Sequence, residues 1–190
     1  MDLNIMMDLK PLYPNLFHPV AQDFNRDYKG QASHHTRTKR PVKYFFIDFG
    51  ISRKYDVGQE APLEPPIFGG DKSVPEFQMS IDPVNPFPTD IYYLGNMIRE
   101  EFLNSTSGLE FMQPLVADMV RKDPTQRPTI NEVAARFDEL RANLSSQVLR
   151  SRLVYLDENE LAHAYYNVRH FFRTIYYVLA RYPAVPTPSP

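Results

Sequence analysis

The chain has 190 residues, enough for one domain of ordinary size, and its 43% hydrophobic and 13% aromatic residues suffice for a buried core. Its 21 basic and 23 acidic residues nearly balance, so the charge gives no reason to expect nucleic acid or a membrane surface as a partner. The absence of cysteine excludes disulfides, thiolate metal sites and a cysteine nucleophile. The chain shows no secretory-signal pattern and no bilayer-length apolar run, so we expect an intracellular protein, cytoplasmic or nuclear.

The first part of the chain is polar and irregular. Prolines and glycine recur between residues 8 and 42, which predicts an exposed loop or insert. His34 and His35 lie in this segment, but adjacent side chains rarely point at one metal, so a solvated loop is favoured.

Residues 43–49 read as a strand, because Tyr44 to Ile47 are aromatic or β-branched and the run stops at Asp48, Phe49 and Gly50. Two interpretations of that ending stay open. Asp and Gly are common turn residues. Alternatively, a carboxylate that a glycine hinge presents at a strand end can reach a Mg²⁺ ion held between phosphates.

Residues 51–88 are dense in proline and glycine, which predicts an extended segment that needs an anchor elsewhere in the fold. Apolar residues at helical spacing then predict a series of helices. The first carries Ile91, Tyr92 and Tyr93 and is apolar nearly all round, so it should be buried. The third should begin with a capping box and bury one apolar face. The predicted helices span residues 88–103, 113–123, 129–144 and 158–182, and the face of the third comprises Ile130, Val133, Ala134, Phe137 and Leu140.

Four short motifs follow one another along the chain in an informative order. Asp48-Phe49-Gly50 is followed by Pro75-Glu76, then by Asp90 and Gly95 in a buried helix, and then by Arg127 in "RKDPTQRPT". This order resembles the C-terminal lobe of a eukaryotic protein kinase. The resemblance implies that Asp48 holds Mg²⁺, that Glu76 closes the activation segment by pairing with Arg127, and that Asp90 braces the catalytic loop. The alternative for Glu76 and Arg127 is that both charges are simply solvated.

The same resemblance makes "MDLNIMM" the tail of the catalytic loop, with Asn4 as the second Mg²⁺ ligand and residues 4–7 as a short strand. The catalytic base would precede Met1, so no residue here is assigned that role. The Gly-rich loop, its lysine and the rest of the N-terminal lobe are not in the sequence either. ATP and Mg²⁺ are thus expected as cofactors of the complete domain, with weak or no binding by these residues alone.

The predicted fold is therefore mainly α: a protein-kinase-like C-terminal lobe with a short β-hairpin at the catalytic loop and no N-terminal lobe. We expect this lobe at residues 1–145 with a polar insert at 10–40, a helical extension at 146–182 and a disordered tail at 183–190. The expected function is ATP-dependent phosphoryl transfer to protein Ser/Thr rather than Tyr, without activity from these residues alone. The alternative is a non-catalytic, kinase-like binding or scaffold module. The protein substrate or partner is not identified by the sequence.

Overall fold

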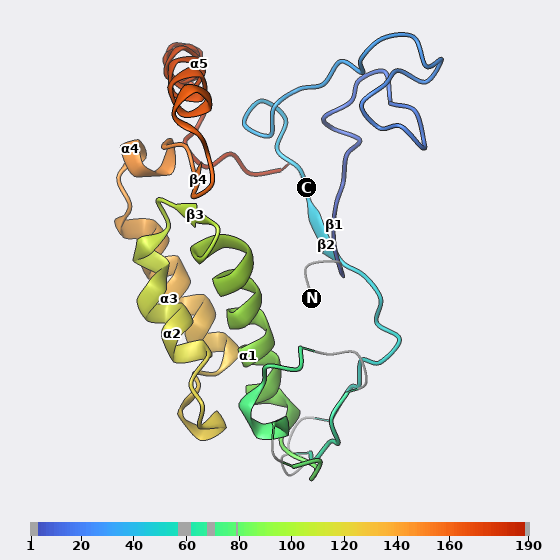
Figure 1. Ribbon diagram of the computed structural model, residues 1–190, viewed down its shortest axis with the longest axis vertical. Helices are drawn as coiled ribbons and strands as arrows, with labels where there is room; N and C mark the ends of the chain where they lie inside the picture. Colours follow the sequence, from blue (N-terminus) through green and yellow to red (C-terminus); the bar gives the residue numbers. More distant parts are fainter. Residues whose placement is uncertain (1–3, 57–61, 68–70, 79, 189–190) are drawn as a thin grey trace. The chain divides into compact units, whose positions relative to one another are not determined.

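Figure 1 shows the computed structural model, which describes residues 4–56, 62–67, 71–78 and 80–188. The described chain is mainly helical, as predicted, and has two small antiparallel sheets. It divides into two compact units: a helical unit, Phe49–Tyr165, and a ribbon unit, residues 4–48 and 166–188. Parts of the segments predicted above lie outside the described residues, namely residues 1–3, positions 57–61, 68–70 and 79 of the segment 51–88, and the last two residues of the predicted tail.

The ribbon unit contains the predicted hairpin strands. Strand β1 (Ile5–Met7) pairs antiparallel with β2 (Tyr44–Phe46), and Ile5 stands opposite Phe46. Every side chain of β2 is exposed, at 51–57% of its surface. The backbone of this segment is thus ordered by its partner strand, because its side chains have no layer to pack on.

The insert between these strands is more structured than an exposed loop. It has no helix, but it has turns and aromatic contacts, and Leu12 and Ala32 are buried. The rings of Phe24 and Tyr28 stack at 4.9 Å. Residues 8–42 are thus mostly exposed or half-buried, as predicted, and they are more ordered than the sequence indicated, because aromatic residues find partners within the insert itself.

The core of the helical unit forms between three helices (Figure 1). They are α1 (Pro86–Ile98), α2 (Gln113–Met119) and α3 (Ile130–Asn143). Helix α1 begins where the Asn85 side chain accepts a hydrogen bond from the Phe87 amide, and it continues into a π-helical turn, Arg99–Leu103. The four residues of the core cluster are Ile91, Leu115, Met119 and Val133.

The predicted apolar face of α3 is only partly correct. The helix begins at the predicted capping box, in which Thr129 and Glu132 bond each other's backbone amides. Val133 is buried and Leu140 packs against the core, but Ile130 is 56% and Phe137 42% exposed. The helix packs through the narrow stripe of Val133 and Leu140, so residues one step around the helix face outward.

The chain closes with short elements and one long helix. Helix α4 (Ser146–Leu149) follows α3, and strand β3 (Thr106–Ser107) pairs antiparallel with β4 (Val154–Tyr155). Helix α5 (Glu160–Leu179) starts after Asn159, whose side chain accepts from the Ala162 amide. Tyr177 is its buried residue. Within the described ranges, no helix combines the length and the apolar character that crossing a bilayer requires.

Candidate functional site

A buried ion pair joins two loops of the helical unit. Glu76 lies in a 3₁₀ turn, Pro75–Phe77, and Arg127 follows another, Pro124–Gln126. The Arg127 Nη1 and Nη2 atoms donate to Glu76 Oε1 and Oε2 at 2.8 and 2.7 Å. The exposed fraction of the side chain is 0% for Arg127 and 6% for Glu76. The ion pair predicted from the sequence is thus present, and the alternative of two solvated charges is wrong.

The hydrogen bonds of Arg127 are complete. Besides Glu76, its guanidinium donates to the carbonyl oxygens of Arg121 (2.8 Å), Pro88 (2.9 Å) and Lys122 (3.5 Å), so all five N–H groups have an acceptor. The guanidinium also lies 4.9 Å from the centre of the Tyr92 ring. A buried charge with this many partners ties the start of α1 and the loop before α3 to the turn that carries Glu76.

The environment of Glu76 keeps it ionised. Burial by itself raises the pKa of the carboxyl group, but the hydrogen bonds from Arg127 and from Thr89 Oγ1 (2.8 Å) outweigh it, and the net pKa is lowered. Thr89 is itself buried in the first turn of α1. The pair is therefore a bidentate, charge-assisted clamp with a third donor on the carboxylate.

A second set of hydrogen bonds, a few residues upstream of Glu76, attaches the extended segment to α1. The Asn96 Nδ2 group of α1 donates to the carboxylate of Asp71 and to Ser73 Oγ, the latter at 3.1 Å. Tyr92 Oη donates to the Ser73 carbonyl at 3.1 Å, and Arg99 donates to the Asn96 side-chain oxygen. Although burial raises the pKa of Asp71, the bonds from Ser73 and Asn96 bring it below its ordinary value. Residues 71–76 are thus fixed to α1 along its length.

Helix α1 fits closely against α2 at Gly95. A Cβ atom at this position would lie 2.7 Å from Met119 Cβ and 3.0 Å from Val120 Cγ1. Asp90, by contrast, lies exposed in the first turns of α1, and its side chain has no hydrogen bond or ion pair within the described chain. Neighbouring protein still removes enough water from its carboxyl group to raise its pKa. The bracing role expected for Asp90 therefore stays a prediction.

The two residues expected to bind metal lie at the same end of the ribbon. The Ile47 amide donates to the Asn4 carbonyl at 2.9 Å, which extends the β1–β2 register by one pair and places Asp48 just beyond it. Asp48 is exposed and takes the left-handed conformation, with φ of 59°. The chain turns at Gly50, as expected, where the Ser52 amide donates to the Phe49 carbonyl at 3.0 Å. Asp48 precedes this turn in a left-handed conformation, which Asp tolerates better than most residues.

Asp48 and Asn4 offer a carboxylate and an amide oxygen, the kind of ligands that Mg²⁺ prefers. Within the described ranges, no cluster of three or more His, Cys, Asp or Glu side chains is placed to hold a metal ion. A pair of donors of this kind fits an ion that is bound mainly through substrate phosphates. Their role as ligands stays a prediction.

The extended segment between Gly50 and the Glu76 turn is held by a polar contact of its own. Glu64 Oε1 accepts from Arg53 Nη1 and from Tyr55 Oη, each at 2.7 Å. The backbone of Glu64 also exchanges two hydrogen bonds with Val84, at 2.8 and 2.9 Å. Phe49, which starts the segment, is 65% exposed. The predicted absence of a long helix here is confirmed over the described residues.

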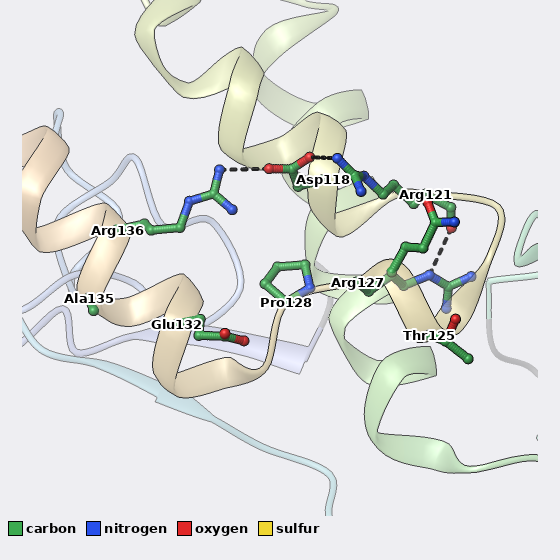
Figure 2. Close-up of a pocket in the computed structure, with 9 residues that line it drawn as sticks. Asp118, Arg121, Thr125, Arg127, Pro128, Glu132, Ala135 and Arg136 are labelled. Atoms are coloured by element: carbon green, nitrogen blue, oxygen red, sulfur yellow. Dashed lines mark hydrogen bonds and ion pairs between the residues drawn. The ribbon is translucent and has the colours of Figure 1, made fainter.

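Arg127 also lines a shallow pocket of about 410 Å³, together with residues of α2 and α3 (Figure 2). Two arginines on its wall point at one acid: Arg121 and Arg136 bond the two oxygens of Asp118 at 2.6 and 2.7 Å. The hydrogen bond from Arg136 is the main reason that the pKa of Asp118 is lowered. Glu132 also lines the pocket, so two acids offset the charges of Arg121 and Arg136, and Arg127 is already paired with Glu76. The pocket therefore has no excess positive charge with which to attract an anion.

We did not predict from the sequence that Asp71, Asn96 and Tyr92 attach the extended segment to α1. Asp71 and Ser73 form a short polar turn, in which the Ser73 amide donates to Asp71 Oδ1 at 2.8 Å. A polar Asn96 within a helix that is otherwise apolar nearly all round was the available signal, since a buried amide needs partners.

Comparisons of the chain with models of protein families, with curated proteins and with solved structures found no match.

Proposed function

We propose that this chain is the C-terminal-lobe part of a protein-kinase-like domain, and that the complete domain transfers the terminal phosphoryl group of ATP to a protein Ser or Thr hydroxyl. The observation that carries the proposal is the buried clamp between Glu76 and Arg127. It joins residues 51 positions apart, and it lies in the order that the resemblance requires between Asp48 and the capped helix α3.

The second observation that supports the proposal is the position of Asn4 and Asp48 at one end of the β1–β2 pair. Phosphoryl transfer depends on positioning and on stabilising charge, and it asks the protein for few covalent steps. Mg²⁺, when bound, neutralises charge on the phosphates. Asp48 and Asn4 are brought to one end of the ribbon by the strand register, and their oxygen atoms suit that ion.

The residues 71–76 then have a clear role in the proposal. They follow the segment that begins at Asp48, and a segment with so many prolines cannot stabilise itself. Hydrogen bonds from α1 to Asp71 and Ser73, together with the clamp on Glu76, fix its far end. Fixing that end is what a substrate-binding segment needs if it is to hold a hydroxyl group in a constant position.

One experiment tests the proposal on the gene product. The coding sequence upstream of the Met1 codon is read, and the encoded protein is purified and assayed for transfer of radiolabelled phosphate. We expect an in-frame His-Arg-Asp, one further residue and then Met1, and we expect activity that Asp48→Asn abolishes. The matched control is Asp56→Asn, an exposed acid of the same segment, which should retain activity. An in-frame stop codon immediately upstream, or activity that Asp48→Asn does not change, would contradict the proposal.

The second candidate is a non-catalytic binding module with the same lobe. The observation that favours it is the amount of exposed apolar surface, which includes all of β2 and most of α5. The phosphate-transfer assay separates the two candidates, because a binding module has no activity to lose. Under both candidate functions, we expect the 190-residue chain alone to transfer no phosphate.

A further inference from the structure

We propose that helix α5 makes this protein a homodimer, by pairing in parallel with α5 of a second copy. The proposal does not depend on the kinase-like function. It starts from the spacing of six apolar residues on α5, which alternates between four and three along the helix. This is the heptad repeat of a coiled coil, and the six seam residues are Leu161, Tyr165, Val168, Phe172, Ile175 and Leu179.

The seam is exposed along its whole length. The exposed fraction of its six side chains runs from 41% for Ile175 to 86% for Leu161. Phe171 and Val178, which flank the seam on one side, are also 60% and 54% exposed. Isolated apolar side chains on a surface are ordinary, but a continuous stripe on a 20-residue helix marks an interaction surface.

The opposite face of α5 is already occupied. Tyr177 lies at the heptad position farthest from the seam, and its hydroxyl meets Thr36 Oγ1 of the same ribbon unit at 2.5 Å. Tyr177 is 8% exposed. The part of α5 that belongs to the ribbon unit therefore packs on the insert through Tyr177, on the side away from the seam.

The exposed area matches what a dimer needs. The six seam residues and the two flanking ones expose on the order of 800 Å² per copy, counting roughly 100 Å² for each partly exposed aliphatic or aromatic side chain. A standard interface takes about 800 Å² from each partner. A second copy supplies the same surface, because a two-fold pair of helices is self-complementary.

The charges favour the parallel arrangement. Arg169 is the one charged residue that flanks the seam. In a parallel pair it lies opposite Ala164 of the second copy, and Phe171 lies opposite Tyr176 of the second copy. In an antiparallel pair that keeps the seam in register, the two copies of Arg169 face each other at the centre. That like-charge contact disfavours the antiparallel alternative.

The test is the mass of the full chain in solution, measured by sedimentation equilibrium. We expect a dimer, and we expect Phe172→Glu to raise the dissociation constant at least about 100-fold, because it places a carboxylate in the seam. Phe172→Leu should leave the dimer intact. The control Ile81→Glu puts the same charge on an apolar residue that is 83% exposed but lies outside α5, and it should also stay dimeric. Circular dichroism checks that each variant keeps its helix content.

The parallel arrangement of the two helices can be tested separately by disulfide cross-linking. The chain has no cysteine of its own, so only introduced cysteines can form a disulfide. Oxidation of Leu179→Cys alone should give a disulfide-linked dimer, because identical seam positions face each other in a parallel pair. A mixture in which Leu179→Cys links only to Leu161→Cys would show an antiparallel pair and overturn the arrangement. A wild-type monomer, a dimer that Phe172→Glu does not weaken, or a monomer whose seam binds lipid vesicles instead would overturn the proposal.

Discussion

Arg127 binds both carboxylate oxygens of Glu76 in a site from which water is almost excluded. Such a pair adds little stability compared with a well-packed apolar pair, but removing one partner leaves the other charge buried and uncompensated. Single substitutions in the clamp should therefore change both the free energy of unfolding and its dependence on pH.

Arg127→Met should cost about 3–5 kcal/mol in the free energy of unfolding, because the methionine keeps the volume but leaves Glu76 unpaired. Urea unfolding followed by circular dichroism measures it. The control is Arg141→Met, which breaks an ion pair with Asp138 whose side chains are 51% and 68% exposed, and which should cost at most about 1 kcal/mol. Equal costs for the two variants would show that the clamp is not a special contact.

The stability that Glu76 contributes should depend on pH. Its pKa is lowered in the folded protein, so the unfolded chain takes up the proton first as the pH falls. The contribution is complete well above the unfolded value of about 4.3 and is lost as the pH falls through the lower, folded value. The difference in unfolding free energy between wild type and Glu76→Gln should thus be largest near neutral pH and shrink below about pH 4. A difference that grows on acidification would contradict the assigned direction.

Gly95→Ala should lower the free energy of unfolding, although the same substitution inside a helix usually raises it. Inside a helix this substitution normally stabilises by up to about 1 kcal/mol. Here the new Cβ would meet Met119 Cβ and Val120 Cγ1, and pushing α1 from α2 should cost about 1–3 kcal/mol. The urea midpoint gives the answer, and an unchanged or higher midpoint would mean that the two helices do not approach as closely as described.

Thr129→Ala should lower the unfolding free energy by about 1 kcal/mol, because it removes the cap from the first turn of α3. Thr129→Ser is the matched control, since its hydroxyl can still accept from the Glu132 amide. Thermal unfolding of both variants distinguishes the lost cap from a general effect of substitution. If serine proves as costly as alanine, the capping hydrogen bond is not the cause.

The helices were predictable because their signals are local. The capping box at Thr129 and the apolar positions of α1 depend on residues within a few turns of one another. The pairing of Glu76 with Arg127 has no local signal, and it was predicted only through the resemblance to a family. The contacts of Asp71 and Asn96 were missed, because they depend on which side of α1 the extended segment crosses. The exposed side of α3 was missed because the width of a packed stripe is set by the neighbouring helix, which the pattern of Ile130 and Phe137 does not reveal.

The most direct test of the account is whether Asp48 and Asn4 bind the metal of a nucleotide complex. Because these residues alone are expected to bind the nucleotide weakly or not at all, the test uses the isotope-labelled protein translated from the complete coding sequence. Mn²⁺, a paramagnetic substitute for Mg²⁺, is added to it with millimolar ATP, and the broadening of each amide signal is measured. The account predicts that the amides of Asn4, Ile47 and Asp48 broaden first, that Asp48→Asn removes this effect, and that Asp56→Asn does not. Broadening spread evenly over the exposed acids, or unchanged by Asp48→Asn, would contradict the assignment of a metal site to this end of the ribbon.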